Sequence, residues 1–132
     1  MFINIQDVQY QKGSSERAPE YAASHDWGTF IRYLEFGDDC FATRQVDAYE
    51  NGYLVRYDRE HWSDQFGSLV DFQFGKLWIK HWGQSDVITR EEFELKWKDS
   101  EESPSISLRN PSPNKPPPWI ELFESGRWPG QA

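Results

Sequence analysis

Four side chains in this chain could carry nucleophilic or metal-binding chemistry: Cys40, His25, His61 and His81. A thiol becomes a nucleophile when an imidazole can take its proton, and a zinc ion needs such ligands at short, regular spacings. No two of the four residues occur at such a spacing, and no H-E-x-x-H pattern is present. We therefore assign no catalytic, metal-binding or cofactor-binding residue, and we expect Cys40 to begin a buried strand.

Two pairs of neighbouring carboxylates, Asp38-Asp39 and Glu101-Glu102, do not form an acid–base pair. Adjacent residues on a turn or linker diverge, whereas glycoside hydrolysis needs carboxyl groups that converge from opposing elements. The chain also lacks a Walker loop, a G-x-G-x-x-G and a G-x-S-x-G motif. A small enzyme of unknown class is therefore the third of three functional hypotheses, and a contact between Cys40 and a histidine in a pocket would favour it.

The aromatic residues include seven tryptophans. Trp78, Lys80 and Trp82 alternate along the sequence, so they would share one face of a strand. The two rings can pack beneath a helix, with the lysine stem beside them. Alternatively, they can form an exposed platform on which a sugar ring or a peptide side chain stacks. Trp78 and Trp82 are therefore the candidate ligand-stacking residues.

The charge of the chain limits its partners. A net charge of −8 and a pI near 4.8 argue against binding to nucleic acid or to an anionic membrane, and they favour a basic protein partner. No apolar run approaches the roughly 20 residues of a membrane span. The first residues lack the basic start and apolar run of a signal peptide. We expect a cytoplasmic protein, and the sequence gives no indication of its oligomeric state.

Residues 40–62 are predicted to form a β-hairpin. Asn51-Gly52 lies between two runs of strand-forming residues, and this dipeptide suits a two-residue type I′ turn, which needs positive φ at both positions. The resulting register would place Asp47 opposite Arg56, so that the two charges pair across the strands.

One face of this hairpin would carry recognition groups. The same register places Tyr49 opposite Leu54 beside the charged pair, on the less aliphatic of the two faces. Aromatic anchors flanked by acidic groups suit the recognition of a basic protein. The candidate partner-binding residues are therefore Asp47, Tyr49, Leu54 and Asp58.

Further strands complete the predicted sheet. Residues 29–36 are apolar or aromatic on both faces, which predicts a central strand with something covering each side. The remaining predicted strands are Phe2–Tyr10, Leu69–Phe74 and Lys76–Trp82. With the hairpin, they give an antiparallel sheet of about five strands.

A short helix is predicted over residues 90–98. Thr89 is the expected N-cap, and Glu92 completes a capping box. Ile88 before the cap and Phe93 after it would form a hydrophobic staple. This helix would pack on one face of the sheet.

The composition predicts three segments. We expect a single α+β domain over residues 1–98, a Pro-, Ser- and Glu-rich linker over 99–118, and a short amphipathic C-terminal arm over 119–132. The apolar residues of the arm could dock back onto the domain or bind another protein. The expected fold class is therefore α+β, with an antiparallel sheet, one short helix and a Pro-rich C-terminal arm.

Three stretches carry a resemblance to a known group of proteins. They are Y-L-E-F-G-D-D, T-R-Q-V-D-A-Y-E-N-G and V-I-T-R-E-E-F-E-L-K-W, within residues 29–98. This part of the chain resembles small uncharacterised bacterial domains in which a sheet is closed by a helix. Some domains of this kind accompany toxin genes as immunity proteins, and the resemblance implies no catalytic residue.

Two hypotheses lead. The first is a non-catalytic protein-binding module, of the immunity-inhibitor type, that recognises a basic protein. The alternative is an aromatic-lined domain that binds a small ligand or a carbohydrate. A solvent-exposed row of tryptophans around a cleft would favour the alternative.

Overall fold

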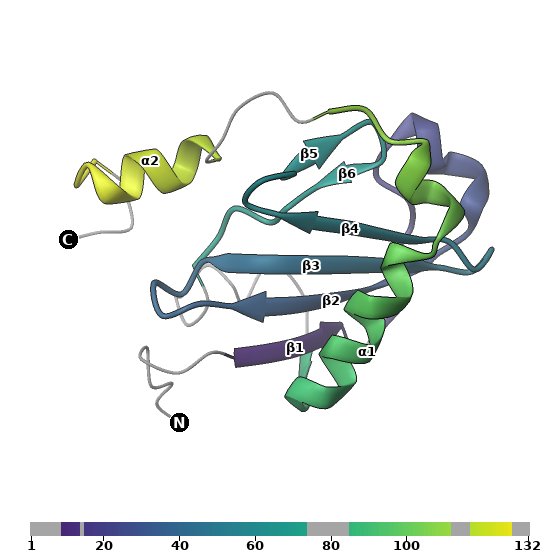
Figure 1. The fold of residues 1–132 in the computed structure, drawn as a ribbon, viewed down its shortest axis with the longest axis horizontal. Coiled ribbons are helices and arrows are strands. Elements are labelled where there is room, and N and C mark those ends of the chain that lie inside the picture. The colour runs from purple at the N-terminus through teal and green to yellow at the C-terminus, as the bar shows by residue number, and fades with distance from the viewer. Residues whose placement is uncertain (1–8, 14, 74–84, 112–116, 128–132) are drawn as a thin grey trace.

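The computed structural model describes residues 9–13, 15–73, 85–111 and 117–127. It shows a five-stranded antiparallel sheet with short helices, and the predicted α+β class is confirmed (Figure 1). The strand order is β4-β3-β2-β1-β7. These strands are β1 (Gln9–Gly13), β2 (Phe30–Phe36), β3 (Ala42–Tyr49), β4 (Leu54–Asp58) and β7 (Ser85–Val87).

Smaller elements surround the sheet. A two-stranded hairpin pairs β5 (Ser63–Asp64) with β6 (Gly67–Ser68). The helices are η1 (Ala22–Trp27) and η3 (Pro104–Ser107), both of the 3₁₀ type, with α1 (Arg90–Glu101) and α2 (Pro118–Glu124). None of the helices in the described residues combines the length and apolarity that a membrane span needs.

Strand β2 is covered on both faces, as its composition predicts. Phe30, Leu34 and Phe36 belong to the larger apolar cluster on one side of the sheet. Tyr33 points to the opposite side, where it joins a smaller cluster that contains Phe93 of α1. The central place of β2 in the sheet explains why this strand alternates between two apolar faces.

Helix α1 begins where the sequence predicts and ends later. The Thr89 side chain accepts a hydrogen bond from the Glu92 N–H at 3.1 Å, which confirms the N-cap. The fully buried Phe93 ring packs 5.5 Å from that of Tyr10. The helix continues to Glu101, three residues past the predicted end.

Arginines from the sheet help to hold α1. The guanidinium of Arg56 lies 3.6 Å from the centre of the Trp97 ring, and that of Arg44 lies about 5 Å from the rings of Phe93 and Trp97. Such cation–π contacts let a helix with few aliphatic residues pack firmly on a sheet.

The β3–β4 hairpin forms, but its predicted turn and register are wrong. Tyr49 pairs with Tyr53 around the three residues 50–52, and the Gly52 N–H donates to the Tyr49 carbonyl at 3.0 Å. Gly52 has a φ of 93°, whereas Asn51 is not among the residues with positive φ. This pattern is a type I turn followed by a glycine bulge, which has one loop residue more than a type I′ turn.

The extra loop residue shifts every cross-strand pair by one. Asp47 lies opposite Val55 rather than Arg56, and Ala48 lies opposite Leu54. Because the side-chain period of a strand is two, such a shift moves the whole set of side chains of one strand to the other face. Asp47 therefore points away from Arg56, toward the larger apolar cluster.

Two further predictions of local structure are wrong in the described residues. Cys40 does not begin a strand, because it ends the turn from Gly37 with a φ of 67° and donates its N–H to the Gly37 carbonyl at 3.0 Å. Residues 69–73 do not form a strand, apart from an isolated bridge between Gln73 and Phe41. The rest of that prediction, most of the strand predicted at Phe2–Tyr10 and all of the strand predicted at Lys76–Trp82 lie outside the described residues.

Helix α2 packs against the face of the sheet opposite α1. Trp119 and Ile120 are 9% and 4% exposed and belong to the larger apolar cluster. The Trp119 ring lies 5.3 Å from that of Trp62, and the Phe123 ring lies 5.1 Å from that of Phe41. The amphipathic segment therefore docks on its own domain.

The segment predicted as a linker begins with ordered structure. Residues 99–101 belong to α1, and η3 follows. Ser103 and Ser105 bind the N–H and the carbonyl of Leu54, and Arg109 donates to the Arg56 carbonyl. These contacts satisfy backbone groups on the outer edge of β4, where another chain could otherwise pair.

Candidate functional site

A buried ion pair lies at the centre of the sheet, on the face opposite α1. Arg32 of β2 and Asp47 of β3 are directly paired in the register, and they are 5% and 1% exposed. Arg32 Nε donates to one carboxylate oxygen at 2.8 Å, and its Nη2 donates to the other at 3.1 Å. The fork of the guanidinium matches the carboxylate, which fixes the position of both groups.

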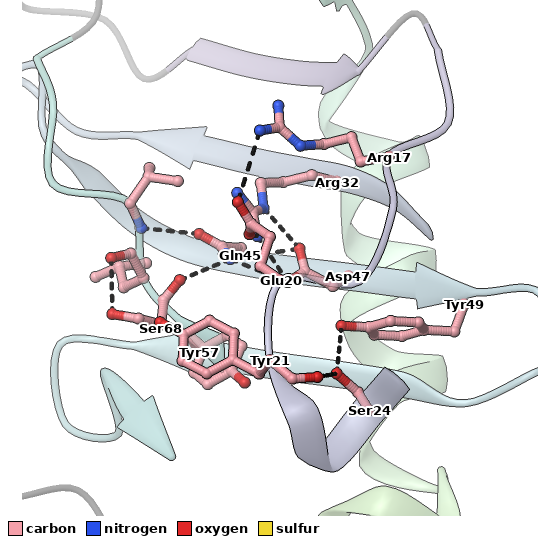
Figure 2. Close-up of polar contacts among 12 residues, drawn as sticks. Arg17, Glu20, Tyr21, Ser24, Arg32, Gln45, Asp47, Tyr49, Tyr57 and Ser68 are labelled. Carbon is pink, nitrogen blue, oxygen red and sulfur yellow. Dashed lines mark hydrogen bonds and ion pairs between the residues drawn. The ribbon is translucent and has the colours of Figure 1, made fainter. Parts of the chain in front are cut away.

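Glu20 extends this pair toward the surface. Arg32 Nη2 also donates to Glu20 at 3.1 Å, and Arg17 lies 3.8 Å from the same carboxylate (Figure 2). Burial lowers the pKa of Arg32, but the attraction of Asp47 and then of Glu20 outweighs it, so the pKa is raised overall. Arg32 therefore stays charged, and its position is set by two carboxylates.

Gln45 joins the ion pair to the segment that follows β6. Its Nε2 donates to the Ser68 carbonyl at 3.0 Å and lies 3.3 Å from each oxygen of Asp47. Its Oε1 accepts from the Val70 N–H at 2.9 Å. Gln45 thus holds the chain at Ser68 and Val70 beside the ion pair.

A pocket of about 280 Å³ opens between these elements. One side comes from the loop before η1, another from the segment after β6, and a third from α2. Arg32 contributes from the sheet beneath. The lining residues are Glu20, Tyr21, Arg32, Ser68, Leu69, Val70, Asp71, Phe72 and Trp119.

Arg32 presents unused donors at this pocket. Its Nε and Nη2 are bonded to Asp47 and Glu20, but no described residue accepts a hydrogen bond from Nη1. Arg32 itself is among the residues that line the pocket. A guanidinium that is otherwise buried and bonded therefore offers two N–H groups to a ligand.

The mouth of the pocket is acidic. Glu20 and Asp71 are both exposed. Asp71 forms no ion pair with any described residue, whereas Glu20 lies between Arg17 and Arg32. The arginines at positions 17 and 32 balance the carboxylates of Glu20 and Asp47, and Asp71 adds one negative charge.

The predicted recognition face does not exist as a surface. Asp47 and Tyr49 are 1% and 6% exposed, and burial raises the pKa of the Tyr49 hydroxyl to about 12. Leu54 packs on the opposite side of the sheet, against the cluster of α1. Asp58 is half-buried and accepts the N–H groups of residues 60 and 61. The prediction of this face failed because it used the wrong register, which assigned these side chains to one face of the hairpin.

The two predicted stacking residues, Trp78 and Trp82, lie outside the described residues. The aromatic wall of the pocket comes instead from Tyr21, Phe72 and Trp119. Trp119 belongs to the amphipathic arm, whose apolar pattern indicates that it needs a partner surface. No sequence motif marks Glu20, Tyr21 or Asp71, because the loops that bring them together are far apart in the chain.

His61 belongs to a structural cluster. Its Nε2 lies 3.1 Å from the buried carboxylate of Asp64, which also accepts from the Tyr57 hydroxyl at 2.7 Å and from the Phe66 N–H. Burial, and then the charge of Asp64, raise the pKa of Tyr57. These bonds brace the β5–β6 turn against β4, away from the pocket lining.

The side chains around the pocket are described by their polar and aromatic groups. Among the residues that the structure describes, no three His, Cys, Asp or Glu side chains converge so that they could hold a metal ion. The pocket lining offers fixed donors, carboxylates and aromatic faces. Comparison of the chain with protein-family models, with curated proteins and with solved structures found no match.

Proposed function

We propose that this chain is a non-catalytic protein-binding module that recognises a basic partner through the pocket beside Arg32. The observation that carries the proposal is the arrangement of that pocket. Aromatic walls and the two exposed carboxylates of Glu20 and Asp71 surround a hollow of side-chain size. Aromatic residues supply anchoring area, and the uncompensated charge of Asp71 favours a positively charged partner.

The whole-chain charge supports the same kind of partner. A net charge of −8 attracts a basic protein over a distance that salt shortens, to about 8 Å at physiological ionic strength. Attraction of this kind raises the association rate more than it lowers the dissociation rate. A basic toxin is one such partner, as the resemblance to immunity-type domains suggests, and the complex would then form in the cytoplasm.

A second candidate function is the binding of a free small ligand. Arg32 favours it, because this residue lines a pocket and no described residue accepts a hydrogen bond from its Nη1. Ligand sites are typically concave, largely apolar and supplied with a few fixed polar groups. The lining of this pocket is more polar than that of such a site, and Trp119, Phe72 and Tyr21 supply its apolar part.

Charge reversal at the mouth of the pocket tests the leading proposal. The partner is first captured from the native host and purified, and its binding kinetics are then measured at two ionic strengths. Asp71→Lys should lower the association rate by about tenfold at low salt, which corresponds to about 1.4 kcal/mol. Asp86→Lys is the matched control, because Asp86 is an exposed residue of β7 outside the pocket lining.

Two results would contradict the proposal. One is a captured partner without a basic surface, whose binding is insensitive to salt. The other is an equal effect of the Asp71 and Asp86 substitutions, which would place the interface away from the pocket.

A further inference from the structure

The geometry points to a specific ligand chemistry for this pocket: a positively charged nitrogen with a carbonyl or carboxylate oxygen a few bonds away. Lysine, arginine and their amides have this combination. The inference rests on the proposed function, because it uses the same pocket, and it adds which group the pocket accepts. We assign the oxygen to the Arg32 end and the cation to the mouth.

The oxygen end follows from the hydrogen bonds of Arg32. A guanidinium has five N–H donors, and three of them bind Asp47 and Glu20. The two donors on Nη1 remain, on a residue that is only 5% exposed. A donor left unpaired in such a site is costly, so a ligand that brings an acceptor oxygen gains relative to one that does not.

The cation end follows from the balance of charge. Arg17 and Arg32 offset Glu20 and Asp47, so the group that surrounds Arg32 is close to neutral and does not attract a bare anion. Asp71 at the mouth is the uncompensated charge among the described residues that line the pocket. A cation placed there is attracted, while a cation placed against Arg32 is repelled.

The walls and the size of the pocket fit a single side chain or amino acid. Tyr21, which is 40% exposed, and Trp119 present aromatic surface along which a chain of methylene groups can lie. The same rings attract a cation that passes over their faces. The volume of about 280 Å³ lies just below the usual range of sites for drug-sized ligands, which begins near 300 Å³.

We assign the positively charged nitrogen to a basic side chain on a partner protein. The whole-chain charge of −8 favours a basic macromolecule, which carries many positive charges, over free lysine or arginine, whose net charge is only +1. In that complex, a backbone carbonyl of the partner supplies the oxygen for Arg32, and the side chain carries the positive charge past Asp71.

Four small probes separate the two ends of the site. They are L-lysinamide, L-lysine, 1,5-diaminopentane and butyrate, titrated into the full-length protein and followed by the NMR shifts of the Val70 and Asp71 amides and the Trp119 indole. 1,5-Diaminopentane keeps both amino groups of L-lysinamide and lacks only its carboxamide. L-lysinamide and L-lysine should bind, 1,5-diaminopentane should bind about tenfold more weakly than L-lysinamide, and butyrate should not bind. Tenfold corresponds to the roughly 1.4 kcal/mol of one hydrogen bond to a charged group.

Variants locate the site without disturbing the buried ion pair. Asp71→Asn should weaken L-lysinamide binding about fivefold, and Tyr21→Ala should weaken it by a similar factor. Asp86→Asn is the control and should leave binding unchanged. Both test residues are exposed, so the fold should tolerate their replacement.

Each of the other outcomes contradicts one part of this inference. Equal binding of 1,5-diaminopentane and L-lysinamide would remove the role of Arg32, and binding of butyrate alone would make the pocket an anion site. If no probe binds while Asp71→Lys still reduces capture of a basic protein, this inference fails and the proposed function stands. If L-lysinamide binds but no basic protein is captured, the ligand chemistry stands and the protein source is wrong.

Discussion

The structural role of Asp47 depends on its neighbour in β2 rather than on its neighbour in β4. In a central strand, each residue has two cross-strand neighbours, and the partner of Asp47 in β2 is Arg32, while its neighbour in β4 is Val55. The carboxylate is buried with Arg32 and is assisted by Gln45. A buried ion pair of this kind adds little net stability, but removing one member is severe, because the other charge stays buried.

The first prediction concerns this ion pair. Asp47→Asn should lower the free energy of unfolding by about 3 kcal/mol or more, because the Arg32 charge then lacks its closest carboxylate. Urea unfolding monitored by tryptophan fluorescence measures the change. The exposed Asp86→Asn should stay within about 0.5 kcal/mol of the parent protein. Equal midpoints for the two variants would show that Asp47 is not buried with Arg32.

The second prediction concerns alkaline pH. Burial raises the pKa of Tyr49 to about 12, while an unfolded tyrosine titrates near pH 10. The folded state therefore holds its proton more tightly, so this contribution to stability is full below about pH 10 and is lost as pH rises toward 12. Tyr49→Phe has no hydroxyl to titrate at this position, so this loss of stability at high pH should be absent in the variant.

The comparison needs two pH values. Between pH 7 and pH 11, the parent protein should lose about 1 kcal/mol more than Tyr49→Phe. At pH 7 the two proteins should differ little, because the Tyr49 hydroxyl makes only a long contact of 3.5 Å with Ser24 Oγ. An identical pH dependence in both proteins would mean that the hydroxyl is solvated in the folded state.

At the level of elements, the β3–β4 hairpin shows how one loop residue decides which face of the sheet a side chain occupies. The glycine bulge at Gly52 adds a residue to the loop, and this moves Asp47 and Tyr49 into the interior. The edge of β4 is then closed by Ser103, Ser105 and Arg109, so the hairpin is held from both sides.

Substitution of Gly52 tests the turn. Its φ of 93° strains any residue with a Cβ, and an added Cβ would meet no atom within 4 Å, so strain is the only penalty. Gly52→Val should cost about 1 kcal/mol or more, and Gly52→Asn should cost less, because asparagine tolerates positive φ. Urea midpoints of the two variants decide the matter, and an unchanged midpoint for Gly52→Val would mean that the bulge is misplaced.

At the scale of the whole molecule, α2 completes the domain. Trp119 and Ile120 fill the larger apolar cluster, and Trp119 also lines the pocket. Aromatic residues form much of this cluster, which compensates for the few aliphatic residues in the chain. Trp119 therefore contributes both to the apolar cluster and to the lining of the pocket.

Removal of α2 is the fourth prediction. A chain that ends after residue 111 should lose about 3 kcal/mol or more and should bind a hydrophobic dye, because the cluster around Trp62 and Phe41 becomes exposed. Trp119→Ala should cost about 3–5 kcal/mol, whereas Leu108→Ala, at a residue that is 54% exposed, should cost less than about 0.5 kcal/mol. Parent-like stability of the shortened chain would show that α2 docks elsewhere.

The sequence by itself determined the features that depend on neighbouring residues. It gave the fold class, the central position of β2, the hairpin around Gly52 and the N-cap at Thr89, because alternation, turn residues and caps act within about ten residues of chain. It also indicated that the segment around Trp119 needs an apolar surface.

Only the tertiary structure decided the register and the pocket. A two-residue and a three-residue turn fit the same Asn51-Gly52, and each gives Asp47 a different face and an arginine partner on a different strand. The pocket brings Glu20, Arg32, Asp71 and Trp119 together from loops, strand and helix. No local sequence pattern encodes this arrangement of residues, because it depends on how the sheet, the loops and α2 pack against one another.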